Sequence, residues 1–224
     1  MPDVTFYRRE RPKDLGRDGL TERSGQLIKY GMARATRIEL PPGFRYIPDF
    51  LSESDERELI RFADTLAFAE VRMHGVVAKR RTAHFGWLYG YESWRITPGP
   101  SIPEALLPYR ERVAELIEVS PARIEEVLVT DYPPGSGIGW HRDAPMFGPV
   151  VVGISLLGPA RFQFRQRTRH GHEAAEAMLE SRSAYVLSGE ARILWQHSIP
   201  AINHHRYSIT FRTLRRLGHG GNEG

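Results

Sequence analysis

A histidine and an aspartate two positions apart are the residues best suited to carry chemistry in this chain. His141 and Asp143 follow a segment rich in glycine and proline that starts at Tyr132. In extended backbone, successive side chains alternate faces, so His141 and Asp143 point to the same side. An imidazole and a carboxylate placed in this way suit two positions of an iron ion and leave others open for reactants. An H-x-D pair alone is a weak signal, because it is also common on surface strands.

A third ligand has to come from elsewhere among the nine histidines. His197 follows the apolar stretch that begins at Ile193 and precedes Ser198-Ile-Pro200, which predicts the edge of a strand entering the core. The other histidines lie in an expected hairpin tip, a polar turn, the C-terminal tail or the region upstream: His74, His84, His170, His172, His204, His205 and His219. We therefore predict that His197 completes the ligand set.

The last expected strand, Arg206–Arg212, carries two arginines on one face. Alternation places Arg206, Ser208, Thr210 and Arg212 on that face, and three apolar residues on the other. Inside a barrel, two inward arginines are costly unless they meet carboxylates. A dicarboxylate co-substrate would supply them, so the metal ligands and the arginine strand support the same prediction.

Together these motifs resemble the AlkB family of iron(II)/2-oxoglutarate-dependent dioxygenases. The signature of that family is H-x-D, a distant H, and then R-x-N-x-T-F-R or a close variant. The separate motifs occur here in the family's order, and the resemblance extends from about Pro41 to Arg212. It also includes Tyr132 with the Pro-Gly that follows, and the segment Ser188–Arg192.

The resemblance implies Fe(2+), 2-oxoglutarate as co-substrate and dioxygen. The implied iron ligands are His141, Asp143 and His197. Arg206 would pair with the distal carboxylate of 2-oxoglutarate, helped by the Tyr132 hydroxyl. Arg212 would hold the proximal carboxylate or the Asp143 ligand. The implied co-substrate residues are therefore Tyr132, Arg206, Ser208 and Arg212.

Three positions depart from the family pattern. Ser208 stands where the family commonly has Asn, and Thr130 stands where it often has Asn two residues before the tyrosine. Either change could re-route hydrogen bonds to the co-substrate. Ala144-Pro145 follows Asp143, where one branch of the family carries an acidic residue that contacts the base. Base selectivity therefore does not transfer.

Strand-like segments dominate the second half of the chain. From about 124 they recur at close spacing, as in 125–132, 150–157, 161–165, 174–180, 183–187 and 206–212, with a turn expected at 189–192. Apolar residues at helical spacing predict helices over about 53–67 and 103–118. We expect an α+β, mainly β fold: a double-stranded β-helix (jelly-roll) core with N-terminal helices packed on the outer sheet.

Three regions follow from composition. Residues 1–40 are polar and predict an N-terminal extension with one possible strand at 26–30, 41–216 form the dioxygenase domain, and 217–224 form a loose C-terminal tail. Net charge is +4, and only three of 31 basic residues are lysines. Arginine favours a polyanionic partner, although genomic base composition would also favour arginine codons. The absence of cysteine excludes disulfides, zinc fingers and thiol nucleophiles.

Basic residues run directly into aromatic ones at about 79–95. Arg81, His84, Trp87 and Tyr89 combine charge for phosphates with rings that could stack on a base. We expect a nucleotide-recognition lid there, and the alternative is a hairpin whose rings belong to the core. Because neither a signal peptide nor a membrane-spanning run is evident, we expect a cytoplasmic protein that does not bind membranes. We also expect a monomer.

The reaction that the resemblance implies is oxidative demethylation (dealkylation) of N-alkylated bases in DNA. It would use iron(II), dioxygen and 2-oxoglutarate, and would release an aldehyde, succinate and carbon dioxide. Three alternatives stay open. The substrate could be RNA, in particular tRNA, because the stretch Arg81–Gly86 also resembles homologues acting on tRNA. It could be a protein side chain. The domain could also be a non-catalytic binding module or a zinc-bound cupin.

Overall fold

The computed structural model describes residues 39–73, 75–89, 96–169 and 171–215. The strand expected at 26–30, nearly all of the N-terminal extension and the C-terminal tail lie outside these ranges. None of the helices within them is both long and apolar enough to cross a membrane.

The larger of two antiparallel sheets has eight strands in the described part of the chain. Their order is β1 (Phe44–Ile47), β10 (Ala184–Leu187), β7 (Phe147–Leu156), β12 (Arg206–Leu214), β5 (Ile124–Tyr132), β3 (Val76–Tyr89) and β2 (Ala69–Met73), with β4 (Ile96–Pro98) paired to β3. The last strand of the chain therefore lies in the middle of the sheet, between β7 and β5.

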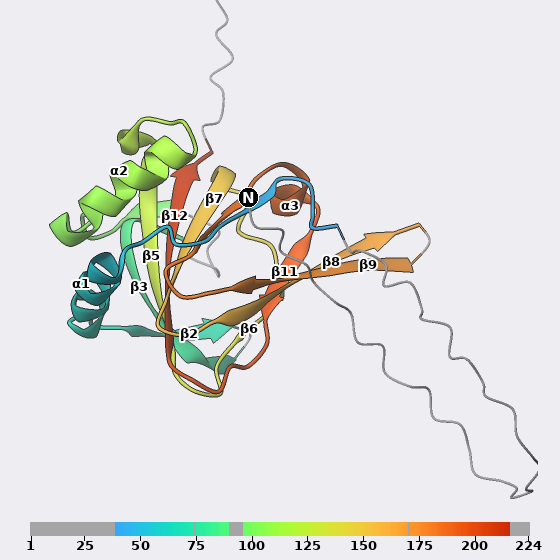
Figure 1. Cartoon of the computed structure of the whole chain (residues 1–224), viewed down its shortest axis with the longest axis horizontal. Helices are drawn as coiled ribbons and strands as arrows, with labels where there is room; N and C mark the ends of the chain where they lie inside the picture. Colours follow the sequence, from blue (N-terminus) through green and yellow to red (C-terminus); the bar gives the residue numbers. More distant parts are fainter. Residues whose placement is uncertain (1–38, 74, 90–95, 170, 216–224) are drawn as a thin grey trace, which may run out of the picture. The chain divides into compact units, whose positions relative to one another are not determined.

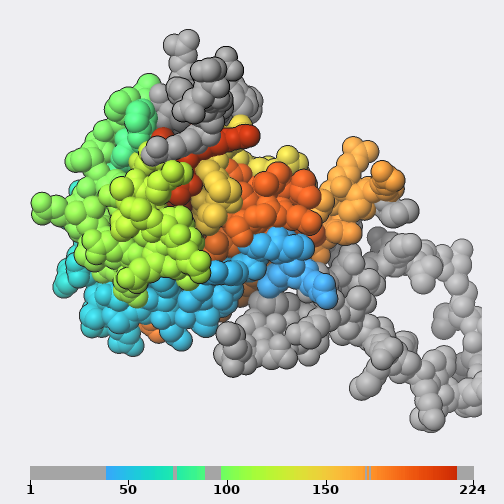
Figure 2. All heavy atoms as spheres, turned by 90° about the horizontal axis from the view of Figure 1, so that it is seen from above, coloured from blue at the N-terminus to red at the C-terminus, as the bar shows by residue number. Residues whose placement is uncertain are grey.

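The smaller sheet has four strands within the same described ranges. Its order is β6 (Ile138–His141), β11 (Gln196–Ile199), β8 (Ala160–Thr168) and β9 (Gly171–Leu179). β8 and β9 form a hairpin that projects to one side in Figure 1 and in the space-filling view of Figure 2. Two antiparallel sheets in this arrangement confirm the mainly β, jelly-roll prediction.

The helices pack on the larger sheet. α1 (Glu53–Asp64) starts with a capping box, in which Ser52 and Asp55 exchange side-chain and backbone hydrogen bonds. α2 (Leu107–Leu116) follows a short 3-10 turn (Glu104–Leu106), a second such turn (Pro121–Arg123) precedes β5, and α3 (Gly189–Ile193) is a single turn. α1 and α2 lie side by side in Figures 1 and 2.

The core fills the space between these helices and the sheet. Leu59 and Ala63 of α1 and Val113 of α2 meet the apolar face of the central strands, which includes Ile209 and Phe211. Alternation along β12 places the apolar residues on this face, as expected. The opposite face of the same strand therefore points to the smaller sheet and is left for polar groups.

Three elements differ from the prediction in extent or in type. The helix expected over 53–67 ends at Asp64, and the one expected over 103–118 begins with a 3-10 turn, because Pro103 and Pro108 cannot donate backbone hydrogen bonds. The turn expected at 189–192 is the short helix α3.

The lid expected at 79–95 is a strand as far as the structure describes it. β3 runs to Tyr89 and pairs with β5 and β4, so its backbone donors and acceptors belong to the sheet. Residues 90–95 lie outside the described ranges. Residues 79–89 therefore belong to a paired strand, and the nucleotide-recognition lid over 79–95 stays a prediction.

Replacing Leu59 by alanine tests how α1 is held. Leu59 is fully buried on the side of α1 that packs against the core, so its truncation leaves a cavity. We expect the free energy of unfolding to fall by about 2–5 kcal/mol, measured by urea denaturation. Glu58 is the exposed neighbour, and Glu58→Ala should change the same quantity by less than about 0.5 kcal/mol. Equal losses in the two variants would contradict packing through Leu59.

Candidate active site

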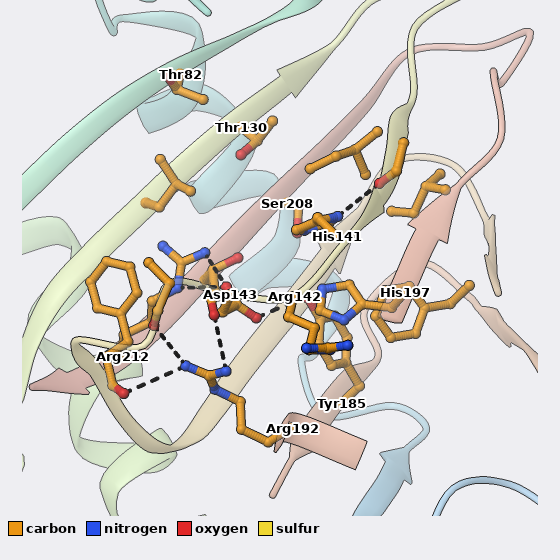
Figure 3. A pocket seen from close by; sticks show the side chains of 18 of the residues that line it. Thr82, Thr130, His141, Arg142, Asp143, Tyr185, Arg192, His197, Ser208 and Arg212 are labelled. Carbon is orange, nitrogen blue, oxygen red and sulfur yellow. Dashed lines mark hydrogen bonds and ion pairs between the residues drawn. The ribbon is translucent and has the colours of Figure 1, made fainter. Parts of the chain in front are cut away.

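The two sheets enclose a cavity of about 1100 Å³. Its walls come from alternate residues of β3, β5 and β12 in the larger sheet and from β6, β8 and β11 in the smaller one. Figure 3 shows the cavity from close by, with His141, Asp143 and His197 near one another and with Arg192 and Arg212 beside Asp143. The residues that sequence analysis selected as metal ligands therefore meet in one cavity.

The two histidines are brought together by strand pairing. β6 and β11 are antiparallel neighbours, and His141 is the Cα partner of His197. Their ring centroids are 4.3 Å apart in an edge-to-face arrangement. Nδ1 of His141 lies 2.8 Å from the Gly139 carbonyl, so a proton on Nδ1 leaves Nε2 with a free lone pair. Strand register thus brings together two histidines that lie far apart in the sequence.

Arg212 holds one oxygen of Asp143. Its Oδ1 accepts hydrogen bonds from Nε and Nη2 of Arg212, at 3.1 and 2.9 Å. Its Oδ2 faces His197, with 3.7 Å to Nε2. Burial alone would raise the pKa of Asp143, but Arg212 and then His197 outweigh burial and hold the pKa well below its usual value. Asp143 is therefore a carboxylate with one oxygen available to a cation.

Both imidazoles are kept in the neutral form that binds metals. Burial, and after it the adjacent His141, lower the pKa of His197 to about 3, and the opposing effect of Asp143 is smaller. Burial also lowers the pKa of His141. Within the described ranges, no three His, Asp or Glu side chains already stand in a geometry that closes on one metal ion. The donor set is nevertheless that of a two-histidine, one-carboxylate iron site with open positions.

Arg192 holds the backbone that carries Asp143. It is buried, and its guanidinium donates to the carbonyls of Asp143 and Ala144 at 3.2 and 2.9 Å, and to that of Phe147 at 3.5 Å. A charged donor that bonds to several carbonyls of one loop restricts that loop. Arg192 comes from α3, so the helix in place of the expected turn positions the loop of Asp143, the predicted metal ligand.

Arg206 carries buried donors next to Tyr132, which lines the cavity. It is fully buried, and its Nη2 donates to Ser155 at 2.8 Å, whereas Nε and Nη1 have no hydrogen-bond partner among the described residues. Its guanidinium lies over the Tyr132 ring, 5.2 Å from the centroid. Tyr132, Thr130 and Ser208 line the cavity. Unpaired buried donors are costly, and a carboxylate would satisfy them.

Three of the four residues expected to bind substrate have described side chains, and these lie on both faces of β3. His84 lines the cavity. Arg81 points to the opposite face, where it donates to the buried carboxylate of Asp131, and Trp87 on the same face lines a separate, smaller cavity against α2. The side chain of Tyr89 lies outside the described set. The prediction for Arg81 and Trp87 therefore needs correction, because alternation along β3 turns them away from the cavity.

Sequence analysis missed several residues on the cavity wall. Arg80, Arg142 and Trp140 all line it, and Glu126 is buried next to Arg212. Alternation from His84 would have selected Arg80 in place of Arg81. The acid at 126 had no local signal, because its importance depends on a partner far away in the sequence.

Comparison with known proteins agrees with this geometry. Residues 43–212 match the model of the 2OG-Fe(II) oxygenase superfamily. An Arabidopsis thaliana protein named "Alkylated DNA repair protein ALKBH8 homolog" is 27% identical over 78% of this chain and 55% of its own length. A Danio rerio protein named "Probable RNA/DNA demethylase ALKBH6" is 30% identical over 67% of this chain and 61% of its own. The chain thus spans little more than half the length of these relatives.

Further similarity comes from a methyltransferase and from solved structures. The Xenopus tropicalis tRNA (carboxymethyluridine(34)-5-O)-methyltransferase alkbh8 is 27% identical over 71% of this chain, but over only 25% of its own length. The structure of OsALKBH1 has a TM-score of 0.58 at 19% identity, covering 78% of this chain and 98% of that one. A Trichoplax adhaerens prolyl hydroxylase in complex with a peptide has a TM-score of 0.55 at 16% identity, covering 77% and 83%.

The solved structures support the jelly-roll fold alone, whereas the family model spans the metal-ligand motif, His197 and the arginine strand. The chain therefore belongs to the 2OG-Fe(II) oxygenase superfamily, as an AlkB-like dioxygenase that depends on Fe(2+), 2-oxoglutarate and dioxygen.

Proposed function

We propose that this protein oxidatively dealkylates N-alkylated bases in nucleic acid, with alkylated DNA as the first candidate substrate. The observation that carries the proposal is the cavity that His141, Asp143 and His197 line together with several arginines. In the proposed site these three side chains hold Fe(2+) through His141 Nε2, Asp143 Oδ2 and His197 Nε2. Arg212 keeps Asp143 ionised, and Arg192 keeps its loop in place.

The chemistry that iron, 2-oxoglutarate and dioxygen supply when bound is the insertion of one oxygen atom into an N-alkyl C–H bond, with the other oxygen atom ending in succinate as carbon dioxide leaves. The resulting N-hydroxyalkyl group loses an aldehyde and restores the N–H of the base. The protein contributes orientation and the exclusion of water. The lowered pKa values of His197 and Asp143 leave the imidazole neutral and the carboxylate ionised at neutral pH. These ligands therefore need not release a proton before they bind the metal.

Arg206 is the proposed anchor for the distal carboxylate of 2-oxoglutarate. Its Nε and Nη1 are buried donors that need an acceptor, and Ser155 fixes the remaining side of the guanidinium. Tyr132 and Ser208 line the cavity beside it, so their hydroxyls are placed to add hydrogen bonds. Serine at 208 is shorter than the asparagine of the family pattern, and it keeps both donor and acceptor capacity.

The mouth of the cavity favours a polyanionic substrate that carries a ring. Arg80, Arg142 and Arg215 line it, and arginines contact phosphates well. Trp140 is 36% exposed at the same mouth, and Arg165 covers its ring at 4.4 Å. The volume of about 1100 Å³ exceeds the need of a small co-substrate alone, which leaves room for a flipped base.

RNA, and tRNA in particular, is the second candidate substrate. The names of several relatives refer to RNA or tRNA, and one refers to both RNA and DNA. Cavity charge alone does not separate the two nucleic acids, because both present phosphates and bases. A protein side chain as substrate is the third outcome that the experiments below distinguish.

Removing a histidine ligand should weaken metal binding severely. We expect His197→Ala to weaken Mn(II) binding by more than about 100-fold, because loss of a direct ligand exceeds the roughly 10- to 100-fold cost of losing an outer partner. Calorimetric titration of metal-free protein measures the affinity. His205 lies outside the cavity, where it bonds to Asp131, so His205→Ala is the control and should retain parental affinity. Parental Mn(II) affinity in His197→Ala would overturn the ligand assignment.

Shortening the Arg206 fork should weaken co-substrate binding. Arg206→Lys keeps the charge but loses the two parallel donors, so we expect the KM for 2-oxoglutarate to rise at least tenfold, which is about 1.4 kcal/mol. Succinate formation at varied 2-oxoglutarate provides the measurement. Arg161→Lys is the control, because Arg161 pairs with Glu176 on the exposed β8–β9 hairpin. An unchanged KM in Arg206→Lys would contradict the proposed anchor.

Aldehyde release from matched methylated oligonucleotides identifies the substrate. We expect release from alkylated DNA, and Arg142→Ala should weaken binding of that DNA and lower the slope of log affinity against log salt by about one. Arg57 lies on α1, away from the cavity, and Arg57→Ala is the control. Release only from tRNA would select the second candidate. Succinate formation stimulated only by a protein substrate would refute both nucleic-acid proposals.

A further inference from the structure

Glu126 is a completely buried carboxylate for which the proposed reaction has no use. It lies on β5 with no exposed surface. Its two oxygens accept hydrogen bonds from Nη1 of Arg212, at 3.1 and 3.0 Å. A buried charge without a partner is strongly unfavourable, so this ion pair explains how Glu126 is tolerated. It does not explain why an acid stands here, since an apolar residue could fill the same space.

Arg212 divides its donors between two carboxylates. Nε and Nη2 point to Oδ1 of Asp143, and Nη1 points to Glu126. The pairing of Arg212 with Glu126 is set by register, because the two residues are Cα partners across β12 and β5. Figure 3 shows Arg212 beside Asp143 at the wall of the cavity. Glu126 therefore acts on Asp143 through Arg212, without touching it.

The charge balance of this cluster depends on Glu126. With Asp143, Arg212 and Glu126 ionised, the three side chains carry a net charge of −1, whereas a neutral residue at 126 would leave them at zero. A site with net negative charge attracts a divalent cation more strongly. Glu126 also competes with Asp143 for Arg212, so Asp143 keeps more of its charge for a cation at Oδ2.

His84 brings the cavity wall into the same network. Its Nδ1 lies 3.5 Å from Oε1 of Glu126. This Nδ1 has no hydrogen-bond partner among the described residues. His84 lines the cavity from β3, while Arg212 does so from β12. Glu126 thus lies next to Arg212, which holds Asp143, and next to His84, which is placed to contact substrate.

We propose that Glu126 is a positioning residue for the metal centre. It holds Arg212 at a fixed distance from Asp143, and it offsets the positive charge of Arg212. Both effects strengthen Asp143 as a ligand. The proposal rests on the metal site assigned under the proposed function, and it does not depend on which substrate the enzyme takes. Glu126 contacts neither the proposed iron position nor the co-substrate anchor.

The test is metal binding by the metal-free protein with Co(II) as the probe. Glu126→Gln keeps the shape and removes the charge, and we expect Co(II) affinity to fall about tenfold, at the lower end of the range for groups that act on a ligand from outside. We also expect the visible absorption bands of the Co(II) protein to shift, because they report the ligand field at Asp143. Glu126→Asp keeps the charge at shorter reach, and its loss should be smaller than that of Glu126→Gln.

Glu125→Gln is the matched control. It makes the same change one position away on the opposite face of β5, where Glu125 accepts a hydrogen bond from the Leu214 backbone and lines the smaller cavity. This variant should bind Co(II) with parental affinity and an unchanged spectrum. Thermal unfolding of each metal-free variant separates a loss of metal affinity from a loss of stability.

Parental Co(II) affinity and spectrum in Glu126→Gln would overturn the proposal, even if its thermal stability falls. Equal losses in Glu126→Gln and Glu126→Asp would overturn it as well, because charge would then be irrelevant. If Glu126→Gln does not fold, Glu126→Asp decides: parental affinity contradicts the proposal, and weakened affinity with a shifted spectrum supports it. Parental Co(II) affinity in His197→Ala would instead show that the metal site itself is misassigned.

Discussion

A single guanidinium between two buried carboxylates is the interaction on which the rest of this site depends. Arg212 bonds to Asp143 on one side and to Glu126 on the other, and it lies over the Phe147 ring at 4.6 Å. Without that cation, two acids would be buried side by side, and at least one would take up a proton. The central place of β12 in the larger sheet makes this arrangement possible, since the strand lies between β5 and β7.

The same strand separates the two functions of the larger sheet. Its apolar face packs under α1 and α2, and its polar face forms the floor of the cavity. The smaller sheet supplies the two histidines through the pairing of β6 with β11. The end of the cavity that holds the predicted metal ligands is therefore built from paired strands. The mouth, with Arg142 and Trp140, is more exposed and suits a larger and more variable partner.

The division between what the motifs predicted and what they missed follows strand geometry. His141, Asp143 and His197 were predicted correctly as neighbours in space, because spaced motifs of the right chemical types rarely coincide by chance. The four residues of the expected lid were treated as one surface, although β3 alternates its side chains between the cavity and the helices. Arg81 consequently bonds to Asp131, and Arg80 takes the position on the cavity wall.

The amino-acid sequence by itself determined the ligand types, the order of the motifs, the alternation of the last strand and the mainly β character of the chain. These properties are local or depend only on spacing, so they can be read without knowing the fold. Only the tertiary structure decided which face of β3 meets the cavity, that Arg192 clamps the Asp143 loop, and that Glu126 opposes Asp143 across Arg212. Each of these depends on pairing between strands far apart in the chain, where a shift of one residue would reverse every side chain.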